Sequence, residues 1–183
     1  MSAHAGNNLV RWFPLMRRPR LTSLLALLLA WPGAAAARDQ GDLLTPEQQR
    51  PADLVVLRRW HSMEGNFAIG VFGAKPDPND AEARTIGIWV ENPTGVRQAT
   101  ETIRCSPTAP MRLGRESRGL VLKELNPGGQ ITDANRLDHQ IWWAACFPAL
   151  AGQDPAQLRA RARQLGYSGQ LTEREQVLPG SPR

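Results

Sequence analysis

The N-terminal segment sets the strongest limit on how this chain folds, because it takes residues away from the folding domain. Its parts follow the order of a secretory signal peptide: a cationic stretch at residues 17–20, an apolar stretch at residues 21–31 and alanines at residues 34–37. We therefore predict that residues 1–37 are a signal peptide and are removed. The uncharged residues 21–37 number 17, the lower limit for crossing a bilayer, so a retained anchor is the alternative.

Charge separates this segment from the rest of the chain. The formal net charge of +5 comes from 22 basic and 17 acidic residues, and residues 1–37 hold four of the arginines and no acid. Removal of this segment leaves 18 basic against 17 acidic residues, a net charge of +1. Because each phosphate contact needs its own cation, a nearly neutral body argues against a nucleic-acid partner. The hydrophobic fraction of 42% is typical of a globular protein, and 183 residues suit a single domain.

Export changes what the two cysteines predict. Cys105 and Cys146 are the only cysteines of the chain, and an oxidising compartment allows them to pair. They do not form a C-x-x-C motif, so we expect a structural disulfide rather than a redox catalyst. Two unpaired buried thiols are the alternative.

Alternating residues predict a series of short strands. The clearest one covers residues 84–91, where Ile86, Ile88 and Val90 occupy every second position. Turn signals at residues 92–95 (NPTG) and 126–129 (NPGG) indicate an antiparallel meander. An apolar run at residues 54–60 fits a strand or a helix, and further strands are expected at residues 66–74, 96–105, 119–125 and 130–132.

The last third of the chain predicts a helix. Asp154 and Pro155 are typical of a helix start, an apolar stripe follows, and Gly166 ends it. The apolar residues 141–147 fit a strand or a helix. The expected class is α+β: a small antiparallel sheet with a C-terminal helix and one disulfide. The predicted boundaries are a signal peptide at residues 1–37, a flexible arm at 38–53, a single domain at 54–170 and a tail at 171–183.

Two groups of side chains are candidates for binding. Trp89, Trp142 and Trp143 are either core residues or an aromatic shelf for an apolar ligand. Arginines recur on the predicted C-terminal helix, where they form either an anion-contacting row or a solvated face: Arg159, Arg161 and Arg163.

We predict no catalytic constellation, no cofactor and no metal site. A metal site would require distant residues to converge, namely His61, His139, Asp133 and Asp138. A cross-strand carboxylate pair of Glu91 and Glu101 depends on the register of the hairpin.

Residues 85–166 resemble the cryptic neisserial-protein-like family of exported bacterial proteins. The matching motifs are GIWVENPTG at residues 87–95, ETIRC at 101–105, CFP at 146–148 and a helix ending in QLG at 164–166. The resemblance implies export and carries no known activity.

These observations favour an exported, non-enzymatic protein of the periplasm or the cell exterior. Its expected partner is an envelope protein or a wall component, with no stable membrane span after cleavage. A carrier of small apolar ligands with a tryptophan-lined pocket is the alternative, and an envelope enzyme with an unrecognised site is the third.

Overall fold

The computed structural model describes residues 44–178. The predicted signal peptide, residues 38–43 of the predicted arm and residues 179–183 lie outside the described residues.

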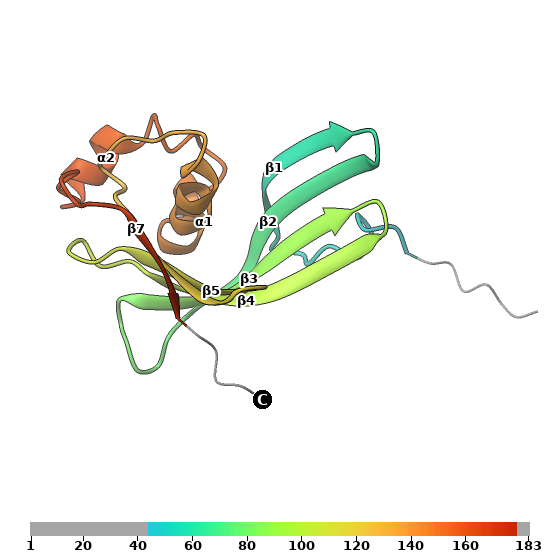
Figure 1. Ribbon diagram of the computed structural model, residues 1–183, viewed down its shortest axis with the longest axis horizontal. Helices are drawn as coiled ribbons and strands as arrows, with labels where there is room; N and C mark the ends of the chain where they lie inside the picture. The colour runs from blue at the N-terminus through green and yellow to red at the C-terminus, as the bar shows by residue number, and fades with distance from the viewer. Residues whose placement is uncertain (1–43, 179–183) are drawn as a thin grey trace, which may run out of the picture. The chain divides into compact units, whose positions relative to one another are not determined.

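A seven-stranded antiparallel sheet forms most of the described chain (Figure 1), and its strands lie side by side in chain order. This arrangement confirms the predicted meander. Turn geometry explains one of the connections: the side chain of Asn92 accepts a hydrogen bond from the Thr94 amide, and Gly95 adopts a φ of +140°, which other residues rarely adopt. The strands are β1 (Val55–Ser62), β2 (Gly65–Pro76), β3 (Ala83–Asn92), β4 (Gly95–Arg104), β5 (Met111–Glu116), β6 (Gly119–Glu124) and β7 (Arg174–Leu178).

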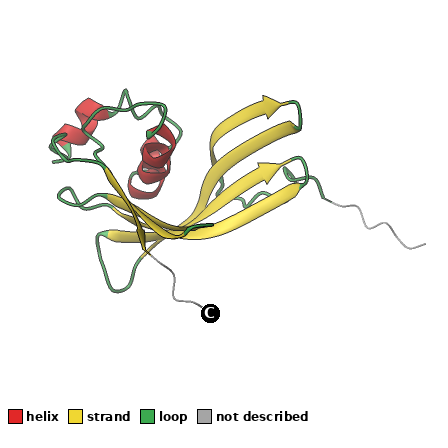
Figure 2. Ribbon diagram, in the orientation of Figure 1, coloured by secondary structure: helices red, strands yellow, loops and turns green. Residues whose placement is uncertain are grey.

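The helices follow β6, and the chain then returns to the sheet through β7 (Figure 2). They are α1 (Arg136–Cys146), the 3-10 helix η1 (Pro148–Leu150) and α2 (Arg159–Gln164). Since the longest of these has 11 residues, the described part of the chain is mainly a sheet with short helices, a smaller helical share than α+β implied.

The core lies between α1 and one face of the sheet, which we call the helix face. Side chains alternate along a strand, so Ile86 and Ile88 of β3 face α1 whereas Trp89 lies on the opposite face. The largest side chains that α1 adds to the core are Ile141, Trp142 and Trp143. Their burial holds α1 against the strands.

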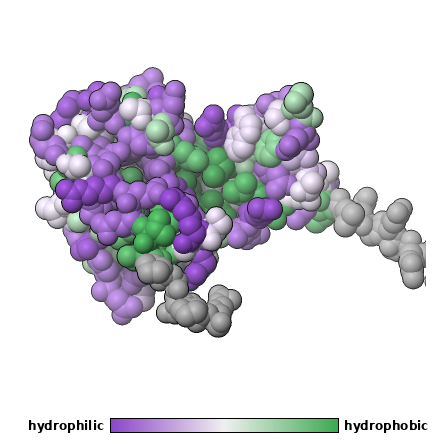
Figure 3. Space-filling view, in the orientation of Figure 1, coloured by the Kyte–Doolittle hydropathy of each residue, from purple (hydrophilic) through white to green (hydrophobic). Residues whose placement is uncertain are grey.

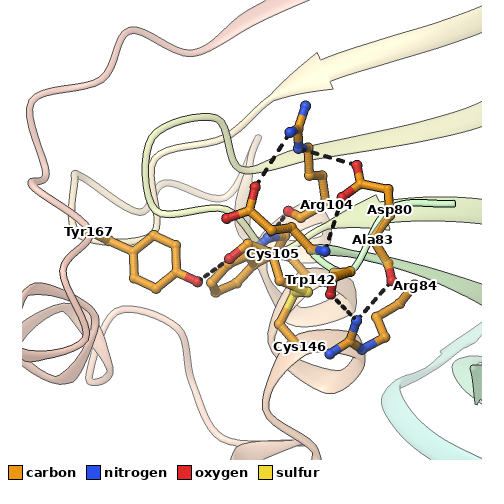
Figure 4. The surroundings of a disulfide bond; sticks show 10 residues. Asp80, Ala83, Arg84, Arg104, Cys105, Trp142, Cys146 and Tyr167 are labelled. Atoms are coloured by element: carbon orange, nitrogen blue, oxygen red, sulfur yellow. Dashed lines mark hydrogen bonds and ion pairs between the residues drawn. A yellow bond between two sulfur atoms is a disulfide. The ribbon is translucent and has the colours of Figure 1, made fainter. Parts of the chain in front are cut away.

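The predicted disulfide is confirmed: Cys105, just after β4, is bonded to Cys146 at the end of α1. Trp142 donates a hydrogen bond from Nε1 to the carbonyl of Arg104, and Tyr167 donates one to the carbonyl of Cys105 (Figure 4). Burial raises the pKa of Tyr167 to about 12. The end of β4 is therefore joined to the helical region by the disulfide and by two hydrogen bonds, one from the Trp142 indole and one from the Tyr167 hydroxyl.

Several boundaries differ from the prediction. Residues 130–132 form no strand, and the partners of β6 are instead β5, which was not predicted, and β7, which lies within the predicted tail. The helix expected at residues 154–166 is reduced to α2, because residues 155–158 form turns. The two ambiguous runs are resolved as strand β1 and helix α1.

Candidate functional site

The three candidate ligand-binding tryptophans are core residues on two sides of the sheet. Trp142 and Trp143 lie on α1 at the helix face, Trp89 lies on the opposite face, and each is at most 2% exposed. Trp142 packs edge-to-face against Trp143 and Tyr167, and Trp89 packs edge-to-face against Phe72. The structure therefore does not bring the three indoles together as one shelf.

The three candidate arginines lie on α2. Arg159 is half-buried, and Arg161 and Arg163 are exposed. Two acids near them in sequence pair elsewhere, because Glu173 contacts His139 and Glu175 contacts Arg118. Arg161 donates to the side chain of Gln164. Arg161 and Arg163 therefore lie on a solvated face of the six-residue helix α2, whereas Arg159 is partly covered.

The carboxylates and histidines considered for catalysis are dispersed. Glu91 lies opposite Val96 on the face that carries Trp89, and Glu101 lies opposite Ile86 on the helix face. His61 is on β1, where its side chain points to the face opposite α1, and is hydrogen-bonded to Asn66. Between residues 44 and 178, no group of three or more metal-ligating side chains is assembled.

A polar cluster lies under α1. Arg112 of β5 donates two hydrogen bonds of 2.5 and 2.7 Å to Glu101 and also pairs with Asp138 of α1, which Lys123 approaches to 3.3 Å. Gly114 leaves the space for this arrangement, because a Cβ there would lie 2.7 Å from the Glu101 carboxylate. The cluster thus ties α1 to β4, β5 and β6 through charged groups that largely compensate one another.

His139, also on α1, is fully buried beside this cluster. Its Nε2 lies 2.7 Å from the Glu173 carboxylate, which also accepts bonds from Asn135 and from the backbone amide of Asn126. These donors hold the pKa of Glu173 below its usual value despite partial burial, which acts in the other direction. Since Glu173 directly precedes β7, the pair fastens the chain where it re-enters the sheet.

Among residues 44–178, the most exposed aromatic residue belongs to the β1–β2 hairpin, and it was not singled out from the sequence. Trp60 is 40% exposed, and its ring stacks on that of Phe67, the residue opposite it on β2, at a centroid distance of 5.3 Å. The guanidinium of Arg58 lies 5.8 Å from the centre of the Trp60 ring. Met63 at the hairpin turn is fully exposed. We call this group, together with the exposed Arg59, the hairpin surface.

Except for Arg59, which points to the opposite face, the hairpin surface continues the apolar helix face beyond the cover that α1 provides. Phe67 is two residues from Ile69 on β2, so both point to the helix face, where Ile69 packs against the core. Apolar surface gathers between the helices and this hairpin (Figure 3). Neither Arg58 nor Arg59 has an ion-pair partner among residues 44–178.

On the opposite face, the N-terminal arm lies beside the same hairpin. Arg50 donates hydrogen bonds of 2.5 and 2.6 Å to the two carboxylate oxygens of Glu91, which also accepts from the indole of Trp89 at 2.7 Å. The bond from Arg50 is the main cause that lowers the pKa of Glu91. The arm and the hairpin border an open hollow of about 370 Å³, lined by Glu47, Arg50, Arg59, Trp60, His61, Asn66, Phe67, Ala68 and Glu91.

Among the described helices, none combines the length and the apolar character needed to cross a membrane. No protein-family model, no curated protein and no solved structure matches this chain. Resemblance to the cryptic neisserial-protein-like family therefore stays a prediction, and the hairpin surface is the candidate site that the geometry itself supplies.

Proposed function

We propose that this chain is a non-enzymatic binding module of the cell envelope, which contacts an envelope protein or a wall component through the hairpin surface. The observation that carries this proposal is the exposure of Trp60. The other three tryptophans of the described chain are at most 2% exposed, whereas Trp60 is 40% exposed and lies beside Arg58, which has no ion-pair partner among residues 44–178.

Such a surface has the composition of a contact site. Tryptophan and arginine supply much of the binding energy in protein interfaces when they become buried, and exposed aromatic groups recur where proteins bind partners. The carrier alternative has weaker support, because Trp89, Trp142 and Trp143 pack against protein atoms and are each at most 2% exposed. An aromatic stack beside free cations supports binding of a macromolecular surface rather than enclosure of a small ligand.

Export to the periplasm or beyond is part of the proposal and rests on residues 1–37. Protein purified from the envelope of its host without reductant should have the mass of a chain that begins at Ala37 or Arg38. This mass should be two hydrogens below that of the same chain with both cysteines reduced. A full-length mass with free thiols would contradict export.

Site-specific photocrosslinking tests the binding surface. A photoreactive phenylalanine analogue at position 60 should form covalent adducts with one envelope component in intact host cells. Val177 on β7 is the matched control position, because its side chain is 41% exposed and lies at the far edge of the sheet. We expect no corresponding adduct from position 177.

The chemical nature of the adduct identifies the partner class. A single protein band or a single wall fragment supports the proposal, provided that Trp60→Ala protein, checked for its disulfide and near-UV circular dichroism, loses association with the same component. Equal labelling from both positions, or no adduct from position 60, would overturn the assignment of the hairpin surface.

A further inference from the structure

The outer side of β1 is an unpaired sheet edge. β1 has eight residues and is hydrogen-bonded only to β2, so no described strand covers its other side (Figure 1). Residues 58–61 of β1 are exposed. An exposed sheet edge offers backbone donors and acceptors to an extended peptide, which gains its affinity from main-chain hydrogen bonds.

Hollows flank this edge on both faces of the sheet. Arg59 and His61 line the hollow of about 370 Å³ on the opposite face. Arg58, which points to the helix face, lines a second hollow of about 410 Å³ together with residues at the start of α1: Asp133, Arg136, Leu137 and Gln140. Since successive side chains of a strand point to alternate faces, a strand added beside β1 would direct its side chains into both hollows in turn.

The charged residues around this edge indicate whether it favours acidic or basic side chains of a bound peptide. Arg58 and Arg59 point to different faces, and neither forms an ion pair within the described chain, although Arg59 lies near enough to Glu91 to contribute to lowering the pKa of that carboxyl; Arg136 already pairs with Asp133 and Asp154. The Glu91 carboxylate in the other hollow is likewise occupied by Arg50. The free charges at the edge are therefore mainly positive, although Glu47 also lines one hollow. Trp60, on the same face as Arg58, adds an apolar contact two residues further along the strand.

From these features we infer that β1 binds an extended acidic segment of a partner protein as an additional strand. Two adjacent acidic residues of that segment pair with Arg58 and Arg59 on the two faces, and an apolar residue packs on Trp60. The inference rests on the proposed binding function and narrows the partner to a protein with such a segment.

Selection from a random decapeptide library displayed on phage, with the purified protein as target, tests this inference. We expect enrichment of peptides with two adjacent acidic residues among β-branched or aromatic ones. The tightest-binding peptide should bind at least tenfold more weakly to the Arg58→Glu/Arg59→Glu variant than to the unchanged protein. The matched control is Arg161→Glu/Arg163→Glu on α2, which changes the same number of exposed charges and should leave the affinity unchanged.

Hydrogen exchange of the complex distinguishes an added strand from a contact made by side chains alone. Amides of β1 should become protected on binding, and replacement of alternate peptide residues by proline should abolish binding, since proline removes the main-chain donors. Enrichment without acidic residues, no enrichment at all, or binding without protection of β1 would overturn the inference. An anionic polysaccharide such as heparin that binds as tightly as the peptide, without protecting β1, would also overturn it. A specific adduct from position 60 would, in each of these cases, leave the proposed binding function standing.

Discussion

At the scale of single residues, the surroundings of a side chain decide its role more than its type does. Four tryptophans of the described chain illustrate this: Trp142 and Trp143 fill the core, Trp89 donates to a buried carboxylate, and Trp60 is left partly in water. Nothing in the sequence near Trp60 distinguishes it from the others, because its exposure depends on where the helical layer ends.

Tyr167 provides a test of the described packing at a single atom. It is the only tyrosine of the chain, so the rise in absorbance at 295 nm with pH reports on this hydroxyl alone. Burial raises its pKa to about 12, and we expect the folded protein to titrate there, against about 10 for the protein unfolded in urea.

The sign of the linked effect on stability follows from this difference. Between about pH 10 and pH 12 the unfolded chain loses the proton while the folded chain keeps it, so the free energy of unfolding should fall as the pH rises through this range. Tyr167→Phe protein should lack the absorbance change and this contribution to the pH dependence. Titration of the native protein near pH 10 would show that the hydroxyl is not buried against Cys105.

At the scale of elements, the N-terminal arm is more firmly held than its composition predicts. The segment from Leu44 to Asp53 contains turns and no strand, in agreement with an irregular arm, yet Arg50 makes two hydrogen bonds to the buried carboxylate of Glu91. Its attachment thus depends on one ion pair with a buried acid, a contact that no local pattern reveals.

Removal of that pair should release the arm. In Arg50→Ala protein the Glu91 carboxylate stays buried without its cation, which should lower the free energy of unfolding by about 2 kcal/mol and speed proteolysis within residues 44–54. Urea denaturation and limited proteolysis measure the two effects. Arg50→Ala combined with Glu91→Gln should recover part of the stability, because the buried group is then neutral and still accepts from Trp89. Equal stability of the single and double variants would contradict a buried charge at Glu91.

Strands whose apolar residues occupy alternate positions, and so lie on one face, were predictable from the sequence. Strands without this pattern were not. β3 was predicted because Ile86 and Ile88 meet the core at alternate positions. β5 was missed because its helix face carries Arg112 and Gly114 in place of apolar residues. Gly114 leaves room for the Glu101 carboxylate of β4, and Arg112 pairs with that carboxylate and with Asp138 of α1. β7 was assigned to a tail because all five of its side chains are exposed and only its pairing with β6 defines it.

At the scale of the whole described domain, the candidate site arises from incomplete cover of the sheet. Helix α1 contacts β1 to β5, but the β1–β2 hairpin extends beyond it, as Figure 1 shows. The sequence predicts β2 as a strand, but it leaves residues 54–60 open between strand and helix and the tryptophans Trp89, Trp142 and Trp143 open between the core and a ligand shelf. It could not identify the hairpin surface, since that requires knowledge of which strand lies at the edge and where α1 ends.

The disulfide joins these layers, and its contribution to stability depends on the compartment in which the chain folds. It closes a separation of 41 residues between the end of β4 and the end of α1, which in the chain-entropy model stabilises the fold by about 4 kcal/mol. The free energies of unfolding measured in urea with and without reductant should therefore differ by about this amount. In the Cys105→Ala/Cys146→Ala protein, reductant should leave the free energy of unfolding unchanged. A difference below about 1 kcal/mol would show that core packing alone holds α1 on the sheet. A difference of about 4 kcal/mol between the oxidised and the reduced protein is a large part of the stability of a domain this size. The chain would then reach its full stability only in an oxidising compartment, as the proposed export requires.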